Sequence, residues 1–355
     1  MTAVLVLGAG KIGVSIAEDL AATGDYDITL ADSDAHALEA RSPGKVEQKR
    51  VDVTDGDALR RALGQAEVVI SALPFFLNQG VAVAAKEGGV HYFDLTEDVK
   101  CARQVLALAK KAKTVFVPQC GLAPGFISIA ANHLVKNFDE VHDVRLRVGA
   151  LPQFPDNALQ YNLTWSTDGL INEYCNPCEA IHDGERRELL PLEGLEHFSL
   201  DGVHYEAFST SGGIGSLCET LVGRVRNLNY KTVRYPGHRD MVQMLVGDLK
   251  LCEYRETFKE VIERGIPITR QDVVLIFVTV TGIRDGLLTQ ESYVKKIYGD
   301  AEGTGRSAIQ TTTSAGVCAL IDLHRQGRLP AAGFVRQEET DFNDLTSNRF
   351  GRVFA

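Results

Sequence analysis

The chain has 355 residues, 45% of them hydrophobic and 24% charged, which is typical of a globular protein with room for two domains. Its formal net charge of −10 disfavours a nucleic-acid partner, which would require a basic surface. No apolar run reaches the roughly 18 residues that a membrane span needs, and the first residues read as a core strand rather than a secretion signal. We therefore expect a cytoplasmic protein without nucleic-acid or membrane partners.

The amino-terminal residues carry the most specific pattern. An apolar strand at 3–7 leads into the sequence Gly-Ala-Gly-Lys-Ile-Gly at 8–13, a helix follows at 11–22, and a second strand at 27–31 ends at Asp32. This order is the fingerprint of dinucleotide binding, in which glycines permit a tight turn and the helix N-terminus faces the pyrophosphate. The expected cofactor contacts lie in this turn and at the ends of later strands: Gly8, Gly10, Lys11, Ile12, Gly13, Asp32, Asp52, Val53, Ala72, Leu73 and Pro74.

Asp32 favours NAD over NADP. Its carboxylate can accept hydrogen bonds from the ribose hydroxyls of NAD but would face the 2′-phosphate of NADP. Two like charges about 4 Å apart repel by roughly 4 kcal/mol at an effective dielectric of 20, which is about a thousandfold in affinity. Asp34 adds to this repulsion, and the nearest arginine that follows is Arg41. We expect NAD as the cofactor.

Strand and helix patterns alternate through the first 120 residues. Short apolar runs predict strands, and apolar residues at helical spacing predict helices between them. Beyond the elements above, these are strands at 46–51, 68–72, 90–93 and 114–117 and helices at 55–64, 78–87 and 98–112, with a further helix starting after 120–125. The alternation predicts an α/β fold with a doubly wound parallel sheet, the Rossmann type.

The pattern changes after about residue 139. Apolar residues that alternate with a period near two predict strands at 141–151, 161–166, 178–182, 204–208, 231–234 and 272–283. Helices are expected at 215–226, 239–265 and 307–325. This mixture predicts a mixed-sheet α/β domain inserted into the first. We expect a dinucleotide-binding domain at 1–139 plus 304–355 and a substrate-binding and dimerisation domain at 140–303.

The seven cysteines are scattered and odd in number, which suits reduced thiols in a cytosolic protein. Cys175 and Cys178 form a Cys-x-x-Cys pair, but no second such pair or tight histidine pair completes a zinc site. The pair also lacks the strand–helix context of a thioredoxin-like redox site. We expect a proline turn with two packed thiols, and no metal.

Ligands of doubly wound sheets bind beyond the carboxyl ends of the strands. That rule selects the segments at 71–74, 94–98 and 120–125. Asp94, Glu97 and Asp98 could attract a cationic amine there, or could serve only as caps of the next helix. Of the three acids we favour Asp94 for substrate contact.

One segment of the second domain also combines groups suited to a substrate site. Arg234 could hold a carboxylate with two hydrogen bonds, and His238 has an imidazole that titrates near neutrality. The alternative is a strand-to-helix turn with surface charges, which spacing alone favours.

These segments carry a resemblance. The glycine loop, the turn at 120–125, the segment at 234–238 and the threonines at 311–313 are together similar to the saccharopine dehydrogenase family, and most to its L-lysine 6-dehydrogenase branch. The resemblance implies a split Rossmann domain with an inserted domain that holds the substrate and the dimer contacts, hence a homodimer or higher homo-oligomer. Many saccharopine-type members carry an acid where this chain has Ala123, which favours a smaller amino acid as substrate.

The resemblance also implies the reaction: NAD-dependent oxidation of the terminal amine of L-lysine to the 6-semialdehyde, which can cyclise. His238 and Asp94 are the candidate bases, and Arg234 the candidate partner of the α-carboxylate. The other expected substrate contacts are Glu97, Cys120, Gly121, Tyr235 and Thr312. Three alternatives stay open: a saccharopine-type reductive condensation, a dehydrogenase of another diamine or amino acid, and a non-catalytic NAD-binding sensor.

Overall fold

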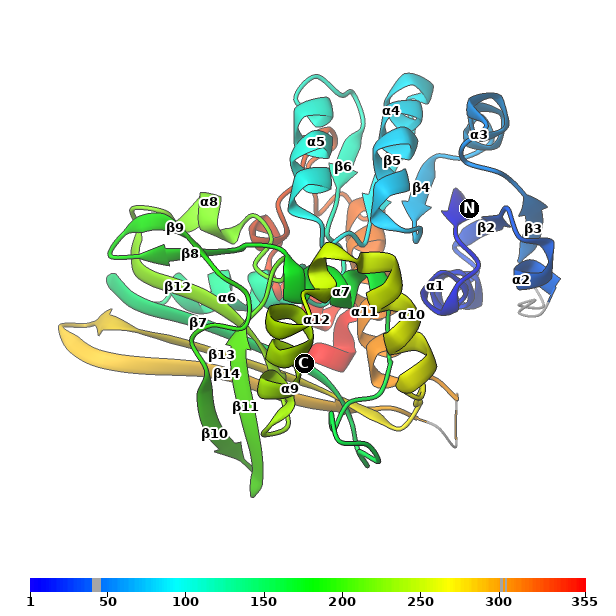
Figure 1. Ribbon diagram of the computed structural model, residues 1–355. Coiled ribbons are helices and arrows are strands. Elements are labelled where there is room, and N and C mark those ends of the chain that lie inside the picture. The colour runs from blue at the N-terminus through cyan, green and yellow to red at the C-terminus, as the bar shows by residue number, and fades with distance from the viewer. Residues whose placement is uncertain (40–45, 301–302, 304) are drawn as a thin grey trace. The chain divides into compact units, whose positions relative to one another are not determined.

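The computed structural model describes residues 1–39, 46–300, 303 and 305–355, so Arg41 lies outside the described residues. The chain divides into two compact units, shown in ribbon form in Figure 1. The first unit comprises Met1–Phe126 and Thr312–Ala355, and the second comprises Ile127–Thr311. The boundaries expected from the sequence fall at 139/140 and 303/304 instead.

The first unit is built on a parallel sheet of seven strands. They are β1 (Thr2–Leu7), β2 (Tyr26–Asp32), β3 (Glu47–Arg50), β4 (Val68–Ser71), β5 (His91–Asp94), β6 (Val115–Val117) and β15 (Gly333–Phe334). Their order across the sheet is β15-β6-β5-β4-β1-β2-β3. This order reverses at β1, as in doubly wound sheets, so the predicted fold class is confirmed.

Helices follow nearly every strand of this sheet. They are α1 (Lys11–Ala22), α2 (Ala35–Glu39), α3 (Gly56–Leu63), η1 (Phe75–Leu77), α4 (Asn78–Gly88), α5 (Val99–Ala109), the part of α11 (Ala308–Arg325) from Thr312 onward, η4 (Gln337–Glu339), α12 (Phe342–Ser347) and η5 (Gly351–Phe354). Figure 1 shows α3, α4 and α5 side by side, in agreement with their contacts. The apolar faces of these three helices pack into the hydrophobic core of the first unit, which also contains Leu5 of β1 and Phe116 of β6.

The carboxyl-terminal residues complete the core of the first unit. The ring of Phe354 stacks on that of Phe126 with 3.9 Å between centroids. The hydroxyl of Tyr26 on β2 donates to Asp322 on α11 at 2.7 Å, and the side-chain amide of Asn348 donates to the same carboxylate at 2.9 Å. Segments from both ends of the chain therefore share one core.

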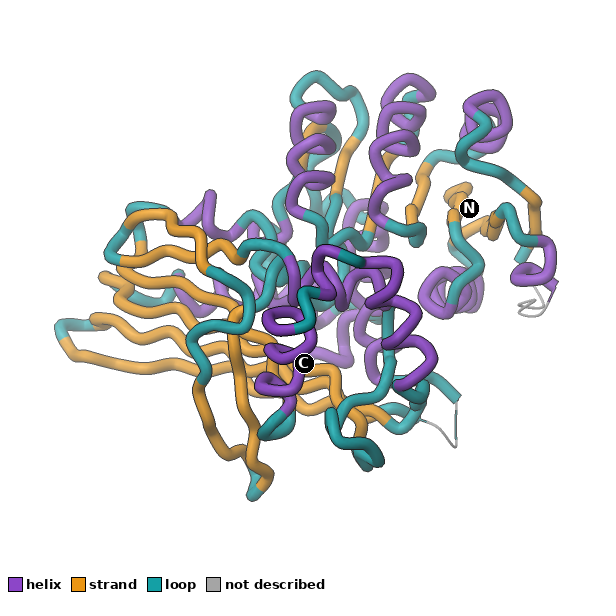
Figure 2. The backbone as a smooth tube through the Cα atoms, in the orientation of Figure 1, coloured by secondary structure: helices purple, strands orange, loops and turns teal. Residues whose placement is uncertain are grey.

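The second unit contains a mixed sheet of eight strands. They are β7 (Glu140–Pro152), β8 (Cys178–His182), β9 (Glu185–Leu189), β10 (Glu196–Leu200), β11 (Val203–Ser209), β12 (Val225–Arg234), β13 (Asp272–Arg284) and β14 (Leu287–Tyr298). The main order is β10-β11-β12-β7-β13-β14, and β8 pairs with β12 and β9. Figure 2 shows β13 and β14 as a long antiparallel pair.

Short helices pack on this sheet. They are α6 (Phe126–Val135), α7 (Thr167–Cys175), α8 (Leu217–Leu221), α9 (His238–Gln243), the π-helical turn η2 (Met244–Asp248), η3 (Leu251–Glu253), α10 (Arg255–Gly265) and the first turn of α11. A hydrophobic cluster around Tyr161, Tyr174, Phe208 and Phe258 joins α7, α9 and α10. No helix in the described parts of the chain is long and apolar enough to cross a membrane.

Three expectations for the second unit were wrong. Residues 161–166 form no strand, since only Leu163 makes an isolated bridge, to Ile268. The expected helix at 239–265 is broken into α9, η2, η3 and α10, and that at 215–226 shrinks to α8 because β12 begins at Val225. Alternation of apolar residues in 161–166 reflects burial of an irregular segment, which periodicity does not separate from a strand.

Candidate functional site

The glycine loop after β1 has the close contacts that a dinucleotide-binding turn requires. Gly8 adopts a φ of +104°, where a side chain is strained, and its N–H donates to Ala31 O at 2.8 Å. A Cβ on Gly8 would meet Ala72 O at 2.6 Å, and one on Gly13 would meet Gly8 O at 1.9 Å. Both positions therefore accept only glycine without rearrangement.

Gly10 is open where its neighbours are crowded. It precedes the first residue of α1, and within the described chain a Cβ built on it would meet no atom within 4 Å. Gly10 has no side chain with which to cap this helix end. A helix N-terminus with open space at Gly10 fits a bound pyrophosphate, and Lys11 and Ile12 lie in the first turn of α1.

Asp32 ends β2 beside this loop. Its carboxylate accepts hydrogen bonds from Ala9 N at 2.7 Å and from Asp34 N at 2.9 Å. Parallel pairing places Arg50, at the end of β3, opposite Asp32, and Arg50 Nε donates to Ser33 O at 3.1 Å. Arg50 is exposed, and reasoning from the sequence overlooked this cation beside Asp32.

The remaining expected cofactor contacts lie along the same edge of the sheet. Asp52 follows β3 and accepts from Thr54 N and Oγ1 at 2.9 and 2.7 Å. The side chains of Val53 and Leu73 pack partly into the core. Ala72 N donates to Leu7 O at 2.8 Å, which holds the end of β4 against the glycine loop, and Pro74 is exposed.

Asp94, at the end of β5, is fully buried. It is 0% exposed, and its carboxylate accepts from Tyr92 Oη at 2.7 Å, Thr96 N at 2.9 Å and Gln119 N at 3.0 Å. Burial raises its pKa, although these hydrogen bonds favour the charged form. Through Gln119, Asp94 holds the segment that follows β6 in place. Because its carboxylate is fully buried, it is poorly placed to bind a substrate amine.

The other two acids after β5 differ from each other. Asp98 caps α5, because its carboxylate accepts from Cys101 N at 2.7 Å. Glu97 is half-buried between Asp94 and this cap. The helix-capping interpretation therefore holds for Asp98.

The turn at 120–125 is buried. The thiol of Cys120 is 0% exposed and donates to Val117 O at 2.9 Å, and burial raises its pKa well above the ordinary value. Gly121 O accepts from Phe126 N at 3.0 Å. Helix α11 packs against this turn, where a Cβ on Gly316 would meet Cys120 O at 2.8 Å, and Thr312 on α11 is fully buried.

Arg234, at the end of β12 in the second unit, is buried in a network of its own. Its Nη1 donates to Thr232 Oγ1 and Val233 O at 2.6 and 2.9 Å, its Nε donates to Tyr174 Oη at 3.2 Å, and its Nη2 pairs with Glu173 at 3.3 Å. Four of the five N–H groups of the guanidinium are used. One N–H remains, so the forked clamp on a carboxylate that the sequence suggested is not available in this conformation.

His238 belongs to the same network, because it accepts a hydrogen bond from the Tyr174 hydroxyl. Its Nδ1 lies 2.8 Å from Leu159 O and its Nε2 lies 2.9 Å from Tyr174 Oη, so Nδ1 carries the proton and Tyr174 donates to Nε2. Burial and then the charge of Arg234 lower its pKa to about 3. A neutral imidazole with both nitrogens engaged is a structural acceptor, which weighs against His238 as the base.

This pKa predicts a specific loss of stability in acid. The folded pKa of about 3 lies below the ordinary 6.5, so as pH falls below 6.5 the unfolded chain binds a proton that the folded chain excludes. At pH 5 this costs about 2 kcal/mol, from about 1.4 kcal/mol per pH unit. Urea unfolding at pH 7.5 and 5.0 should show this loss in the parent and not in His238→Gln. Equal losses in both proteins would contradict the assigned cause.

Unpaired polar atoms buried in the second unit indicate room for water or a polar ligand. Asn162 Oδ1, Asn172 Nδ2 and Thr210 Oγ1 are buried and lack a partner within the described chain. Asn172 precedes Glu173, and Thr210 precedes Ser211, whose N–H donates to Glu173 O at 3.0 Å. Buried polar groups are rarely left unpaired, so water or a polar ligand is expected beside Glu173.

Sequence reasoning missed two members of this group, Glu173 and Tyr174, because it left α7 unassigned. A signal existed: Ser166 caps the helix by accepting from Gly169 N at 3.2 Å, and Asp168 lies in its first turn. Tyr235, expected near the substrate, instead donates through its hydroxyl to Pro152 O at 2.8 Å and stacks on Tyr205.

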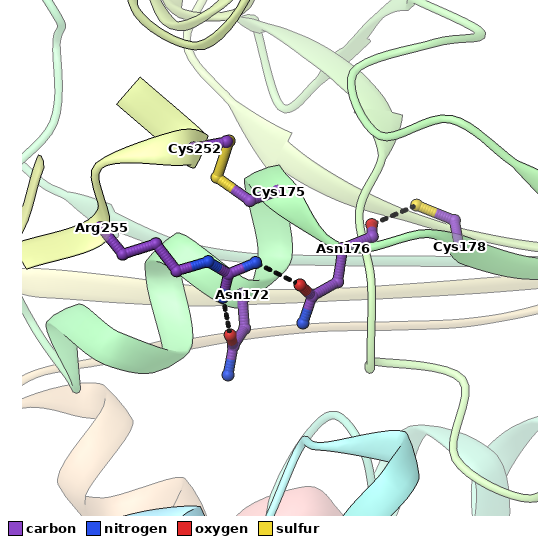
Figure 3. The surroundings of a disulfide bond; sticks show 6 residues. All are labelled: Asn172, Cys175, Asn176, Cys178, Cys252 and Arg255. Carbon is purple, nitrogen blue, oxygen red and sulfur yellow. Dashed lines mark hydrogen bonds between the residues drawn. A yellow bond between two sulfur atoms is a disulfide. The ribbon is translucent and has the colours of Figure 1, made fainter. Parts of the chain in front are cut away.

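The cysteine prediction needs a correction. Cys175 forms a disulfide with Cys252 rather than staying reduced, while Cys178 is a buried free thiol after the Pro177 turn (Figure 3). The two bonded residues are 77 apart in sequence, and only the packing of α7 beside η3 brings them together. Among the described residues, no group of three or more histidine, cysteine or acidic side chains is arranged to hold a metal ion.

Comparisons with known proteins agree with this geometry. Residues 4–117 match the saccharopine dehydrogenase NADP binding domain, and residues 121–350 match the saccharopine dehydrogenase C-terminal domain. The chain belongs to the saccharopine dehydrogenase family. Of the family's two domains, the nucleotide-binding one thus contains the glycine loop and Asp32.

Individual members of the saccharopine dehydrogenase family are distant. Saccharopine dehydrogenase [NADP(+), L-glutamate-forming] of Saccharomyces cerevisiae is 29% identical over 259 residues, 68% of this chain and 57% of that protein. Mitochondrial alpha-aminoadipic semialdehyde synthase of Rattus norvegicus is 23% identical over 324 residues, 84% of this chain and 33% of that protein. The chain thus spans about 57% of the length of the yeast relative.

A solved structure supports the fold directly. The structure of saccharopine dehydrogenase (L-Glu forming) from Saccharomyces cerevisiae superposes with a TM-score of 0.81 at 18% identity, covering 97% of this chain and 95% of that one. At this identity the likeness establishes the fold of the family.

Proposed function

We propose that this chain is an NAD-dependent dehydrogenase that oxidises the terminal amine of L-lysine to the 6-semialdehyde. The observation that carries the cofactor assignment is the arrangement of Gly10 and Asp32: open space at the start of α1, beside an acid at the end of β2. NAD bound there would supply the hydride acceptor for oxidation of the amine-bearing carbon, and hydrolysis of the oxidised amine would release ammonia. The names of the curated relatives, which concern saccharopine and alpha-aminoadipic semialdehyde, support an amino-acid substrate of this class.

The preference for NAD distinguishes this proposal from the NADP(+) in the names of several relatives. Asp32 places a carboxylate where a 2′-phosphate would lie, which disfavours NADP. Arg50 has the opposite effect and favours NADP, since an exposed guanidinium beside Asp32 could pair with that phosphate. We propose that Asp32 decides the preference and that Arg50 limits its strictness.

Removing the charge of Asp32 should reverse part of this preference. Asp32→Asn keeps an oxygen for Ala9 N–H but loses the repulsion, so the NAD-to-NADP affinity ratio should fall by about 30- to 150-fold, or about 2–3 kcal/mol. Adding Arg50→Gln should cancel most of the gain in NADP affinity. Fluorescence titration with both reduced cofactors measures these ratios.

The matched control for this titration is Asp27→Asn. Asp27 is an exposed acid at the other end of β2, paired with Ala3, so its change should leave both affinities unaltered. An unaltered ratio in Asp32→Asn would remove Asp32 from the cofactor site.

For the substrate we propose contacts around the Arg234 network. In the second unit the unpaired atoms of Asn162, Asn172 and Thr210, with the remaining N–H of Arg234, receive the α-amino-carboxylate group. Asp94 and His238 act by positioning rather than as bases.

A second candidate is oxidation of saccharopine, which the names of the relatives favour. The two reactions differ in the group that leaves after hydrolysis: ammonia from lysine and L-glutamate from saccharopine. Incubating the chain with NAD and each of lysine, saccharopine, ornithine and α,ω-diamines, while following absorbance at the reduced-nicotinamide band, separates them. Product analysis for ammonia and glutamate completes the assay, and the absence of turnover with every amine would favour an NAD-binding sensor.

We further propose a cytoplasmic homodimer. The edge strand β14 exposes Leu287, Leu288, Val294 and Tyr298 at 70%, 69%, 42% and 58%, and an edge strand with exposed apolar side chains is suited to pairing with a second copy. Light scattering of the purified chain determines the stoichiometry, and cell fractionation determines the location.

A further inference from the structure

The Cys175–Cys252 disulfide lies next to the buried network of the second unit. Cys175 ends α7 and Cys252 lies in η3, with their Cα atoms 5.5 Å apart (Figure 3). Both residues are half-buried, whereas the five free cysteines are all buried. A soluble thiol therefore has better access to this bond than to any of the free cysteines.

Arg255 makes a second, non-covalent link at the same place. Its Nη1 donates to Asn172 Oδ1 at 2.8 Å and its Nη2 donates to Asn176 Oδ1 at 2.6 Å. Figure 3 shows the guanidinium reaching from the start of α10 to both asparagines at the end of α7. The end of α7 is thus held once by a covalent bond and once by a pair of charge-assisted hydrogen bonds.

Helix α7 carries the groups that organise Arg234 and His238. Glu173 pairs with Arg234, and Tyr174 joins Arg234 to His238, while the next residue is Cys175. Cys175 also packs against the hydrophobic cluster that contains Tyr161 and Tyr174. A change in how Cys175 is held is therefore transmitted to this network within one residue.

We propose that the Cys175–Cys252 disulfide is a reversible redox brace that holds α7, and with it the Tyr174–Arg234–His238 network, in place. A dithiol reductant opens the bond: its thiolate attacks one sulfur, its second thiol displaces the mixed disulfide, and two electrons and two protons leave two thiols on the chain and a cyclic disulfide on the reductant. Arg255 then keeps the two thiols close, so that a disulfide oxidant such as oxidised glutathione re-forms the bond by accepting the two electrons.

Cys178 does not compete for this exchange. It lies three residues from Cys175, but its thiol is buried, and burial raises its pKa to about 12. Since the thiolate is the attacking species, Cys178 is a poor nucleophile towards the disulfide. The brace therefore switches between two states, bonded and open.

The single tryptophan of the chain supplies a readout that is independent of catalysis. Trp165 donates through Nε1 to Tyr161 Oη at 3.2 Å and packs against the same cluster as Cys175. Treating the full chain with dithiothreitol should change Trp165 emission and raise amide hydrogen exchange in α7 about tenfold, while α3 in the first unit stays unchanged. Oxidised glutathione should restore both signals.

Three variants sharpen this experiment. Cys252→Ser should show the reduced-state exchange in α7 with or without dithiothreitol, and Cys178→Ala, the matched control, should respond as the parent does. Arg255→Met should slow re-formation of the bond by oxidised glutathione by about tenfold, because the thiols are no longer held together. Identical exchange in α7 before and after complete reduction, with reduction confirmed by thiol titration, would overturn the proposal.

The consequence for catalysis rests on the proposed function. Reduction should raise KM for the amine substrate about tenfold, while the affinity for NAD, which the first unit binds, stays within about twofold. An unchanged KM alongside loosened α7 would contradict the link to the substrate site but keep the brace. A chain without turnover would refute the proposed function alone, because hydrogen exchange still decides the state of α7.

Discussion

Replacing Arg234 by methionine is expected to lower the free energy of unfolding of the second unit by about 3–5 kcal/mol. The substitution removes the cation that pairs with the buried Glu173, and it removes the donors to Thr232, Val233 and Tyr174. It also removes the guanidinium that lies 4.8 Å from the centre of the Tyr161 ring. Urea unfolding, with the second-unit transition followed by Trp165 fluorescence, measures this loss.

Two further variants identify its cause. Arg187→Met removes an exposed pair with Glu185, so it should leave the transition unchanged. Combining Arg234→Met with Glu173→Gln neutralises the stranded carboxylate and should recover part of the stability, giving a coupling between the two sites. Strictly additive losses, or a loss in Arg234→Met no larger than in Arg187→Met, would show that Arg234 is not held as described. A raised KM with normal stability would instead return Arg234 to the role of a substrate clamp.

The second large effect concerns cofactor affinity. Gly10→Ala is expected to weaken NAD binding by about 100-fold, or about 2.7 kcal/mol, without changing the melting curve. The added methyl group meets no atom within 4 Å in the described chain, so the fold accepts it, but it occupies the space assigned to the pyrophosphate. Calorimetric titration with NAD measures the affinity.

Two other glycines frame this result. Gly80→Ala, on α4, also meets no atom within 4 Å and should leave both affinity and stability intact. Gly13→Ala should fail for another reason, since its Cβ would lie 1.9 Å from Gly8 O and the loop itself must move. Normal NAD affinity in Gly10→Ala would sink the assignment of the loop, and with it the proposed function.

The first unit could be predicted because each of its strands is a short apolar run with its own turn. Val4–Leu7 and Val68–Ile70 are buried on both faces of the sheet, so their runs are continuous and their ends distinct. The glycine loop could be predicted because steric demands at Gly8 and Gly13 are local. Constraints that act between residues close in sequence can therefore be recognised from the sequence pattern.

The second unit was predicted less well because its constraints are long-range. Arg234 meets Glu173 and Tyr174 across about 60 residues, and Cys175 meets Cys252 across 77, so no spacing reveals either contact. Arg50 was overlooked beside Asp32 for the same reason: parallel strand register joins positions that the sequence separates by a helix. Sequence patterns therefore reveal the glycine loop of the first unit, whereas only the packed structure reveals the Arg234 network of the second unit.

The stacking of Phe354 on Phe126 has a consequence for biosynthesis. On the ribosome, the nucleotide-binding fold emerges first but lacks α11, α12 and Phe354 until translation has passed through residues 127–311, which takes about 10–40 s at 5–20 residues per second. The first unit therefore stays incompletely packed while residues 127–311 are being synthesised. Chaperone dependence of the newborn chain should accordingly concentrate on residues 1–126.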